Sequence, residues 1–322
     1  MEKNELEKLR EYCKTVWECN SEWSSRKMLE HHLSYYLFII QKTSKRKNKD
    51  LFEKDATIIN QMMFSKLLHV KKIFEGVNYE DFRLGKLNNI IDPGQIAILV
   101  RNMFETVVLF HLVYTFPNTE EKKKLMYNLW VISGLKYRQR FEVTAKKNEE
   151  KQKEELDTIQ KKTDEILNSD YFKNLSEREQ NKINNAIRKK EFKLILHDES
   201  VEFLHWNEVY LKLNFRENIF NEIYNYLSLH AHPSNVAVFQ FDGIFDTEHK
   251  HYLRLAYTNL RYAFMMSSVF ITEYLNLFPE LMKYFNQISI PDQILLNFHN
   301  TVARGEKYSI NDTWKILGTI NE

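Results

Sequence analysis

The sequence predicts an all-α protein, a multi-helix bundle, and three observations support this fold class. Only seven Gly and five Pro occur in 322 residues, whereas sheet-rich folds use both residues in their many tight turns. Hydrophobic residues make up 43% of the chain and aromatic residues 14%, which is enough for a large core. Apolar residues also recur at helical spacing along most of the chain.

Three helices are predicted at the N-terminal end. Apolar residues follow a helical period in the first helix, which begins near the N-terminus, and again at 28–39 in the second. The basic run 42–50 separates the second helix from a third at 51–74. The third helix is expected to end near Gly76, because glycine commonly follows a helix C-terminus.

Two longer helical stretches are predicted in the middle of the chain. An apolar helix is expected at 95–116, because Pro117 cannot continue it. From Glu120 we expect one very long helix, whose segment 141–168 carries charges of alternating sign and lacks Gly and Pro. This pattern is typical of a solvated helical arm, so the segment is expected to project from the body.

Helices dominate the last third as well. They are predicted at 176–190, 198–213, 216–230, 247–278, 280–288 and 291–303. Pro233 ends the third of these, and the alternating stretch 236–245 is the one place where a short strand or hairpin is expected. The chain then divides into N-terminal helices at 1–79, a main helical domain with the arm at 80–290, and a helical tail at 291–322.

Charge, cysteine content and hydropathy favour a cytoplasmic location without a membrane. The 46 Lys and Arg against 44 Asp and Glu give a formal net charge of +2, which does not by itself predict a polyanionic partner. Cys13 and Cys19 are the only cysteines, too few for a disulfide scaffold.

The charged start lacks the apolar stretch of a signal peptide. The apolar stretches 95–116 and 255–278 contain charged residues, each costing about 2.5–3.5 kcal/mol at a bilayer centre.

The first polar constellation is Arg101 and Glu105, in the middle of the apolar helix 95–116. Their spacing of four places both side chains on one helix face, where they can pair. A buried pair is costly unless further hydrogen bonds complete it. The pair is therefore either a structural ion pair or part of a site that lines a polar cavity.

The second constellation is YNYLSLHAHPS at 224–234, which gathers Tyr226, Ser228, His230 and His232 at a helix end. Imidazoles beside hydroxyl groups can carry out acid–base chemistry at neutral pH, but they can also form a helix-capping motif. A metal site would need a third ligand, such as Glu105, Asp242 or His249. The sequence places none of these nearby, so no metal and no cofactor are predicted.

The sequence motifs that contain these two groups of residues resemble those of a known protein family. DPGQIAILVRNMFE followed by Y-x-x-L-S-x-x-x-H-P-S resembles a widespread bacterial family catalogued only as a domain of unknown function, over roughly residues 50–270. The resemblance implies a helical fold and a bacterial origin, but no activity. The positions it carries over are Arg101, Glu105, Tyr226, Ser228 and His232.

A second, weaker similarity is to the small helical ribonucleases and toxins of bacterial defence systems. In these proteins an Arg steadies a phosphate, and a His four to six residues later moves a proton at the ribose hydroxyl. Here Arg26 precedes His31 and His32, although Lys27 departs from the usual polar residue after the Arg. The basic run 42–50 is either a further phosphate contact or a solvated loop.

Two functions from different classes follow as expectations. The first is a component of a phage-defence or toxin system whose buried polar pocket, built from Arg101, Glu105 and the segment 226–232, binds or cleaves an RNA-like phosphodiester or nucleotide without a metal. The alternative is a non-catalytic subunit that docks a protein partner through the arm 141–168, within a homo- or hetero-oligomer. No phosphate-binding loop, G-x-S-x-G, H-E-x-x-H or kinase signature supports another enzyme class.

Overall fold

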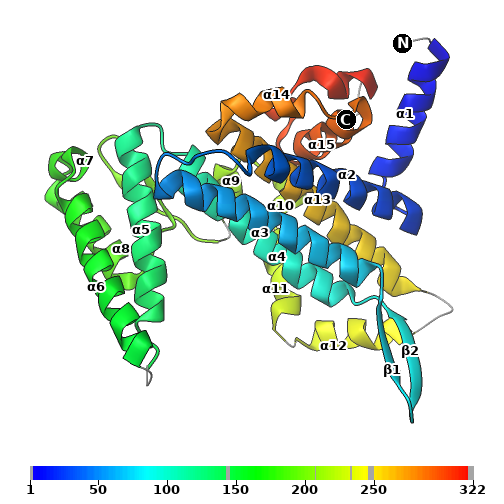
Figure 1. Cartoon of the computed structure of the whole chain (residues 1–322), viewed down its shortest axis with the longest axis horizontal. Coiled ribbons are helices and arrows are strands. Elements are labelled where there is room, and N and C mark those ends of the chain that lie inside the picture. Colours follow the sequence, from blue (N-terminus) through cyan, green and yellow to red (C-terminus); the bar gives the residue numbers. More distant parts are fainter. Residues whose placement is uncertain (1–2, 143–145, 207, 233, 246–249, 318–322) are drawn as a thin grey trace. The chain divides into compact units, whose positions relative to one another are not determined.

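The computed structural model describes residues 3–142, 146–206, 208–232, 234–245 and 250–317 (Figure 1). Helices make up about three quarters of the chain, and the described part contains two short antiparallel two-stranded sheets. The predicted all-α fold class is therefore confirmed. The chain divides into two compact units, one formed by Met1–Val108 with Tyr210–Glu322 and the other by Leu109–Val209.

The first unit begins with the three predicted helices, α1 (Lys3–Trp17), α2 (Glu22–Thr43) and α3 (Leu51–Phe74). Ser21 caps α2 in a reciprocal bond with Ser24, and the Asp50 carboxylate accepts from the backbone N–H of Glu53 at the start of α3. Such caps satisfy amide groups that have no partner within the helix. The basic run separates α2 from α3, as predicted.

A β-hairpin that the sequence analysis missed follows α3. Strands β1 (Val77–Asp81) and β2 (Gly85–Ile90) pair antiparallel. Gly85 at the turn has a φ of 99°, which favours glycine. The hairpin leads to α4 (Pro93–Phe110), which a π-helical turn, His111–Thr115, continues.

The stretch Pro93–Thr115 matches the predicted apolar helix. Among the described residues, it is the one helical stretch long and apolar enough to cross a membrane, and 67% of its most apolar window is buried inside the structure. A core helix of a folded protein has the same properties. The structure thus accounts for this apolarity by burial within protein.

The C-terminal part of the chain adds short helices and then two long ones. The short helices are α9 (Val209–Lys212), α10 (Glu217–Phe220), α11 (Ile223–Ala231), α12 (Asn235–Asp242) and α14 (Met282–Phe285), and the long ones are α13 (His251–Leu277) and α15 (Ile290–Arg304). Short 3-10 turns lie at Gly243–Phe245, Pro279–Leu281, Glu306–Tyr308 and Asp312–Leu317.

The predicted strand at 236–245 is wrong, because this stretch forms α12 and the 3-10 turn after it. A lone strand has no neighbour for its backbone groups, whereas a helix satisfies them internally. Ser234 caps α12 by accepting from the backbone N–H of Ala237. Pro233, which was expected to end the preceding helix, lies outside the described residues.

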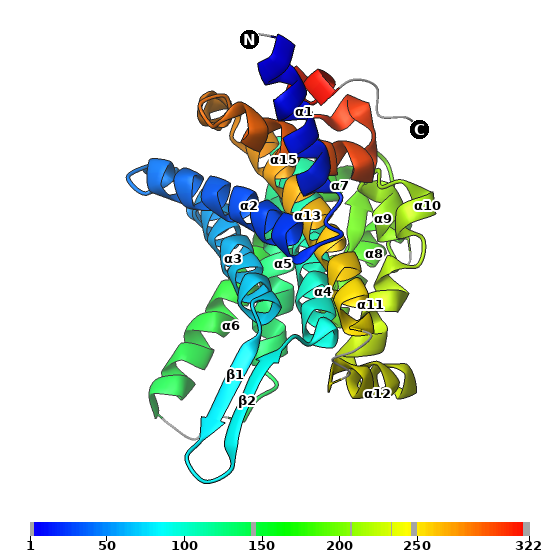
Figure 2. The same cartoon turned by 90° about the vertical axis from the view of Figure 1, so that its right-hand side faces the viewer.

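The core of the first unit forms around α13. This helix packs against α2, α3 and α15, and nearly all of its residues from Ala263 to Leu275 are buried (Figures 1 and 2). Helices from all three predicted segments, 1–79, 80–290 and 291–322, therefore contribute to one core. Within it, a buried ion pair joins Glu273 of α13 to Arg304 of α15 at 2.6 Å.

The second unit contains α5 (Glu120–Arg138), α6 (Lys146–Leu167), α7 (Asp170–Asn174), α8 (Glu177–Lys189) and a small sheet of β3 (Leu194–Leu196) and β4 (Val201–Phe203). The helix predicted at 198–213 is wrong, because β4 and α9 share this stretch. Three-residue strands offer too little alternation to be recognised.

The predicted continuous arm is also wrong, because α5 ends near Gln139 and α6 packs back along α5 (Figure 1). Near the turn, Glu155 accepts hydrogen bonds from Arg138 and Gln139, and further along Asn128 donates to Glu165 at 3.1 Å. The segment 141–168 is thus the second helix of an antiparallel pair. Its buried side chains are Glu155, Ile159 and Ile166.

Candidate functional site

The predicted Arg101–Glu105 pair forms on α4, with 3.1 Å between Nε of Arg101 and Oε1 of Glu105. Nη2 of Arg101 also donates to the hydroxyl of Tyr224 on α11 at 2.9 Å, and the guanidinium lies 4.9 Å from the centroid of that ring. The Arg101 and Glu105 side chains are 20% and 31% exposed. The pair therefore sits at a half-exposed seam between α4 and α11 and not in a buried chamber.

Tyr224 is a residue that the sequence analysis missed at this seam. In Y-x-x-L-S the tyrosine stands three positions before Leu227, which is Tyr224 and not Tyr226. Strict use of that spacing would have identified it. Ser228 donates from its hydroxyl to the backbone oxygen of Tyr224 at 2.5 Å, a bond within α11 that leaves Ser228 in a local structural role.

Lys66 on α3 is a second missed residue. Its Nζ donates to the hydroxyl of Thr106 and to the backbone oxygen of Asn102 at 3.5 Å. Burial lowers the pKa of Lys66 to about 8, while the carboxylate of Glu105 acts in the opposite direction. Two basic residues from different helices thus lie near Glu105, and no local pattern in the sequence links Lys66 to α4.

Tyr226 has a bridging role. Its hydroxyl donates to Oδ1 of Asn259 on α13 at 2.8 Å, and Nδ2 of the fully buried Asn259 donates to the backbone oxygen of Pro93 at 2.8 Å. Burial raises the pKa of Tyr226. This chain of hydrogen bonds ties α11 and α13 to the first turn of α4.

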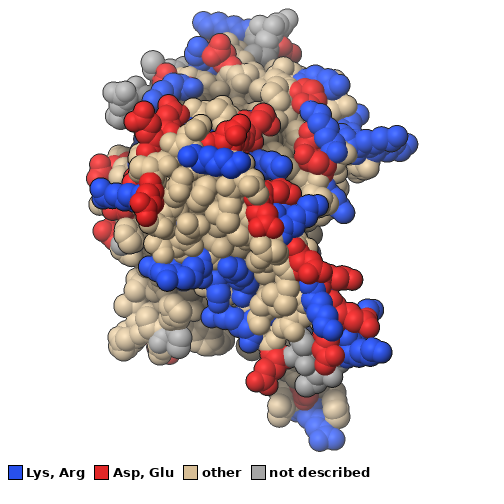
Figure 3. Space-filling view, turned by 90° about the vertical axis from the view of Figure 1, so that its left-hand side faces the viewer, with Lys and Arg blue, Asp and Glu red and all other residues tan. Residues whose placement is uncertain are grey.

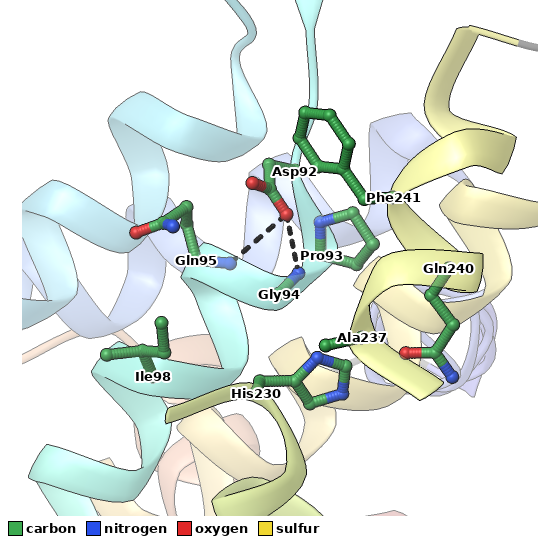
Figure 4. A pocket seen from close by; sticks show the side chains of 9 residues that line it. All are labelled: Asp92, Pro93, Gly94, Gln95, Ile98, His230, Ala237, Gln240 and Phe241. Atoms are coloured by element: carbon green, nitrogen blue, oxygen red, sulfur yellow. Dashed lines mark hydrogen bonds between the residues drawn. The ribbon is translucent and has the colours of Figure 1, made fainter. Parts of the chain in front are cut away.

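His230, at the end of α11, lines a small pocket beside the start of α4 (Figure 4). The pocket has a volume of about 120 Å³. It is lined by Asp92, Pro93, Gly94, Gln95, Ile98, His230, Ala237, Gln240 and Phe241. We call it the Asp92–His230 pocket.

Asp92 and His230 lie on opposite sides of Gly94 in this pocket (Figure 4). Oδ1 of Asp92 accepts from the backbone N–H groups of Gly94 at 2.8 Å and Gln95 at 3.2 Å, which caps α4. A Cβ atom on Gly94 would lie 3.0 Å from Oδ1 of Asp92 and 3.4 Å from Nδ1 of His230. A larger residue at this position would therefore require Asp92 or His230 to shift by a few tenths of an ångström.

The imidazole of His230 is 9% exposed, and its Nε2 has no hydrogen-bond partner. Burial lowers the pKa of His230, and the nearby Asp92 carboxylate opposes this shift. The ring is therefore neutral near pH 7. Oε1 of Gln240 is likewise buried without a hydrogen-bond partner. The residues that line the pocket therefore include two buried polar atoms without a partner, which are uncommon in folded proteins.

The two predicted constellations share the α4–α11 seam but lie at different levels of it. Arg101 is seven residues beyond Gly94, which corresponds to about 10 Å along a helix, and neither Arg101 nor Glu105 lines the pocket. His232 is exposed at the C-terminal end of α11. The structure thus places His230 in the pocket and leaves Arg101, Glu105, Tyr226, Ser228 and His232 outside it.

Arg26, His31 and His32, on which the weaker similarity rests, do not share a common site. Arg26 pairs with Glu22 at 2.7 Å. Nδ1 of His31 lies 2.5 Å from Asp292, and His32 is buried with its Nδ1 2.7 Å from the hydroxyl of Ser267. These side chains are used in separate structural contacts.

Among the described residues, no group of three or more His, Cys, Asp or Glu side chains could hold a metal ion. His249, one of the third ligands considered, lies outside the described residues.

Comparison with known proteins gives no match: no protein-family model fits the chain, and neither a curated protein nor a solved structure resembles it significantly.

Proposed function

We propose that the chain is a ligand-binding helical protein whose site is the Asp92–His230 pocket. The observation that carries this proposal is the buried Nε2 of His230, which has no partner within the protein. Leaving a buried polar group unpaired costs about 1–3 kcal/mol. A bound molecule that forms this hydrogen bond would recover part of that cost.

The lining favours a small ligand that donates hydrogen bonds. Asp92 supplies negative charge, Oε1 of Gln240 is an acceptor, and the neutral imidazole of His230 can accept at one ring nitrogen. The aromatic ring of Phe241 would favour a cation. A volume of about 120 Å³ accommodates about four water-sized groups of ~30 Å³ each, the number of non-hydrogen atoms in a guanidinium ion. The ligand class is therefore a guanidinium or a short primary ammonium.

Calorimetric titration with methylguanidinium and ethylammonium, each compared with acetate and inorganic phosphate, tests this proposal. We expect saturable binding of the cations alone. Asp92→Asn keeps an oxygen that can cap α4 but removes the charge, and it should weaken binding at least tenfold. His230→Phe should abolish binding while Ser228→Ala, outside the pocket, leaves it unchanged. Equal binding by Asp92→Asn, or binding of acetate in preference to the cations, would contradict the proposed class.

A second candidate function is binding of an RNA-like phosphodiester, which the basic residues around Glu105 favour. Arg101 pairs with this partly exposed carboxylate, and Lys66 on a second helix interacts with it electrostatically. A phosphate could replace Glu105 as the partner of Arg101. A role in bacterial phage defence or in a toxin system, in the cytoplasm, belongs to this candidate by analogy only.

Substitutions of Arg101 and His232, made one at a time, test this second candidate. Arg101→Gln should lower affinity for a short single-stranded RNA at least tenfold while the melting temperature changes little. His232→Gln should abolish cleavage of the RNA, without loss of affinity, if the chain is a ribonuclease. Unchanged RNA affinity in Arg101→Gln, or unfolding of that variant, would favour a purely structural ion pair.

A further inference from the structure

The most exposed apolar side chains of the described part lie on the β1–β2 hairpin. Phe82 and Leu84 at its turn are 88% and 90% exposed, and Val77, Tyr79 and Leu87 on the strands are also exposed. The hairpin is a separate two-stranded sheet, so each strand has one edge without a neighbour. Two-stranded hairpins are only marginally stable in water, and free edges are sites of strand addition.

Helix α12 exposes a second apolar group. None of its residues is buried, and Phe239 is 70% exposed, with Val238 and Phe241 exposed on the same short helix. Phe245, in the turn that follows, is exposed as well. A short helix whose large apolar side chains are mostly exposed lacks much of the packing that normally stabilises a helix.

The hairpin and α12 lie at the same end of the first unit (Figures 1 and 2). We call their exposed apolar residues together the hairpin–α12 surface. An aromatic side chain can bury about 150–250 Å², and five largely exposed aromatic residues contribute here: Tyr79, Phe82, Phe239, Phe241 and Phe245. Together with the aliphatic residues, these two groups approach the ~800 Å² that one partner buries in a standard interface.

Charge on the hairpin indicates which partner fits. Glu80 and Asp81 precede the turn, Arg83 lies within it and Lys86 follows it, so the tip carries two charges of each sign. Such a tip neither attracts a polyanion nor favours an acidic lipid surface. Two copies related by a two-fold axis can instead pair the acidic residues of one tip with the basic residues of the other.

Figure 3 shows one face of the molecule, on which Lys and Arg lie among Asp and Glu except for a group of Lys and Arg side chains below the centre. We propose that two copies of this chain associate through the hairpin–α12 surface. The free strand edges and exposed aromatic residues of one copy then pack against those of the other.

Sedimentation equilibrium of the full chain tests this association. The wild-type chain of 38.9 kDa should behave as a dimer at micromolar concentration. The double variant Phe82→Ser, Leu84→Ser should raise the dissociation constant at least 100-fold. Both side chains are almost fully exposed. The melting temperature of the double variant should therefore equal that of the wild-type chain at concentrations low enough for the wild type to be monomeric. Val238→Ser with Phe239→Ser provides an independent variant on α12.

The matched control is Leu156→Ser, which replaces a half-exposed leucine of the second unit and should leave the dimer intact. A wild-type chain that stays monomeric at 100 µM would overturn the proposal, as would a dimer that both double variants retain. Binding of the monomeric chain to phosphatidylcholine–phosphatidylserine vesicles through the same residues would also overturn it, because the surface would then serve a membrane. None of these measurements depends on the Asp92–His230 pocket.

Discussion

His32 and His299 are buried side by side in the core of the first unit, with ring centroids 5.8 Å apart. Burial lowers the pKa of both, that of His299 to about 4, and the charge of Arg261 acts on His299 in the same direction. Both imidazoles are therefore neutral in the folded protein. The hydroxyl of Ser267 and the backbone oxygen of Leu295 supply their hydrogen bonds.

We predict that these histidines make the fold sensitive to mild acid. In the unfolded chain a histidine gains its proton near pH 6.5, whereas folded His299 gains it only near pH 4. Between these values the unfolded state binds more protons, so stability falls as pH falls, by at most ~1.4 kcal/mol per pH unit for each histidine. Urea titrations at pH 7.5 and pH 5.0 measure this loss.

A variant separates His299 from other groups. His299→Leu fills the same buried site with an apolar side chain that does not titrate, so the stability of this variant should fall less between the two pH values than that of the wild-type protein. Asp292 does not contribute between pH 5.0 and pH 7.5. Its hydrogen bonds to His31 and Ser289 lower its pKa from an already acidic value, although burial acts in the opposite direction. An unchanged difference in His299→Leu would show that other groups cause the acid sensitivity.

Residue identity at the candidate site was only partly predictable. The spacing of Arg101 and Glu105 predicts their pair, and the tyrosine-containing motif marks the right segment of α11. The approach of Lys66 and the use of Tyr224 depend on how α3 and α11 pack against α4. Spacing along one helix carries no information about such contacts between helices.

Among the elements, α13 and α15 are joined by the Glu273–Arg304 pair, whose side chains are 2% and 4% exposed. Arg304 also stacks on Tyr308, with 4.5 Å between the guanidinium carbon and the ring centroid. Removing one member of a buried pair leaves the other charge without compensation.

We predict that Glu273→Ala destabilises the protein by about 3–5 kcal/mol, the usual cost of breaking a buried ion pair. Asp312→Ala breaks an exposed pair with Lys315 of similar length, 2.8 Å, and should cost less than ~1 kcal/mol. Chemical denaturation of both variants compares the two. A loss below ~1 kcal/mol in Glu273→Ala would mean that water reaches the pair.

Elements with a strong helical period were predictable, and the remaining ones were not, for identifiable reasons. Helices α1 to α4, α13 and α15 each repeat apolar residues over several turns. The described side chains of the β1–β2 hairpin are mostly exposed, so they show no alternation of the kind that marks a half-buried strand. The break between α5 and α6 contains neither Gly nor Pro in its described residues, and local breaker signals could not reveal it.

The two compact units each have their own buried side chains. The second unit, Leu109–Val209, buries Leu129 and Ile132 on α5 and Ile183 on α8. A compact unit with its own apolar core can unfold separately from the rest of a chain.

We predict that thermal unfolding is not a single two-state transition. Differential scanning calorimetry should give a van't Hoff enthalpy below the calorimetric enthalpy, or two resolved transitions. Ile132→Ala, within the second unit, should lower the midpoint temperature of only one of the two transitions. Equal enthalpies and a single shifted transition in this variant would show that the chain unfolds as one cooperative block.

The order of the units along the chain has a consequence for biosynthesis. Residues 109–209 interrupt the first unit, whose core needs both α2 and α3 from the early chain and α13 and α15 from its last quarter. A ribosome making ~5–20 residues per second completes the later helices some ten seconds or more after α3. During that delay the apolar faces of the nascent N-terminal helices lack their final neighbours, so the growing chain is a natural client for a chaperone that shields such faces.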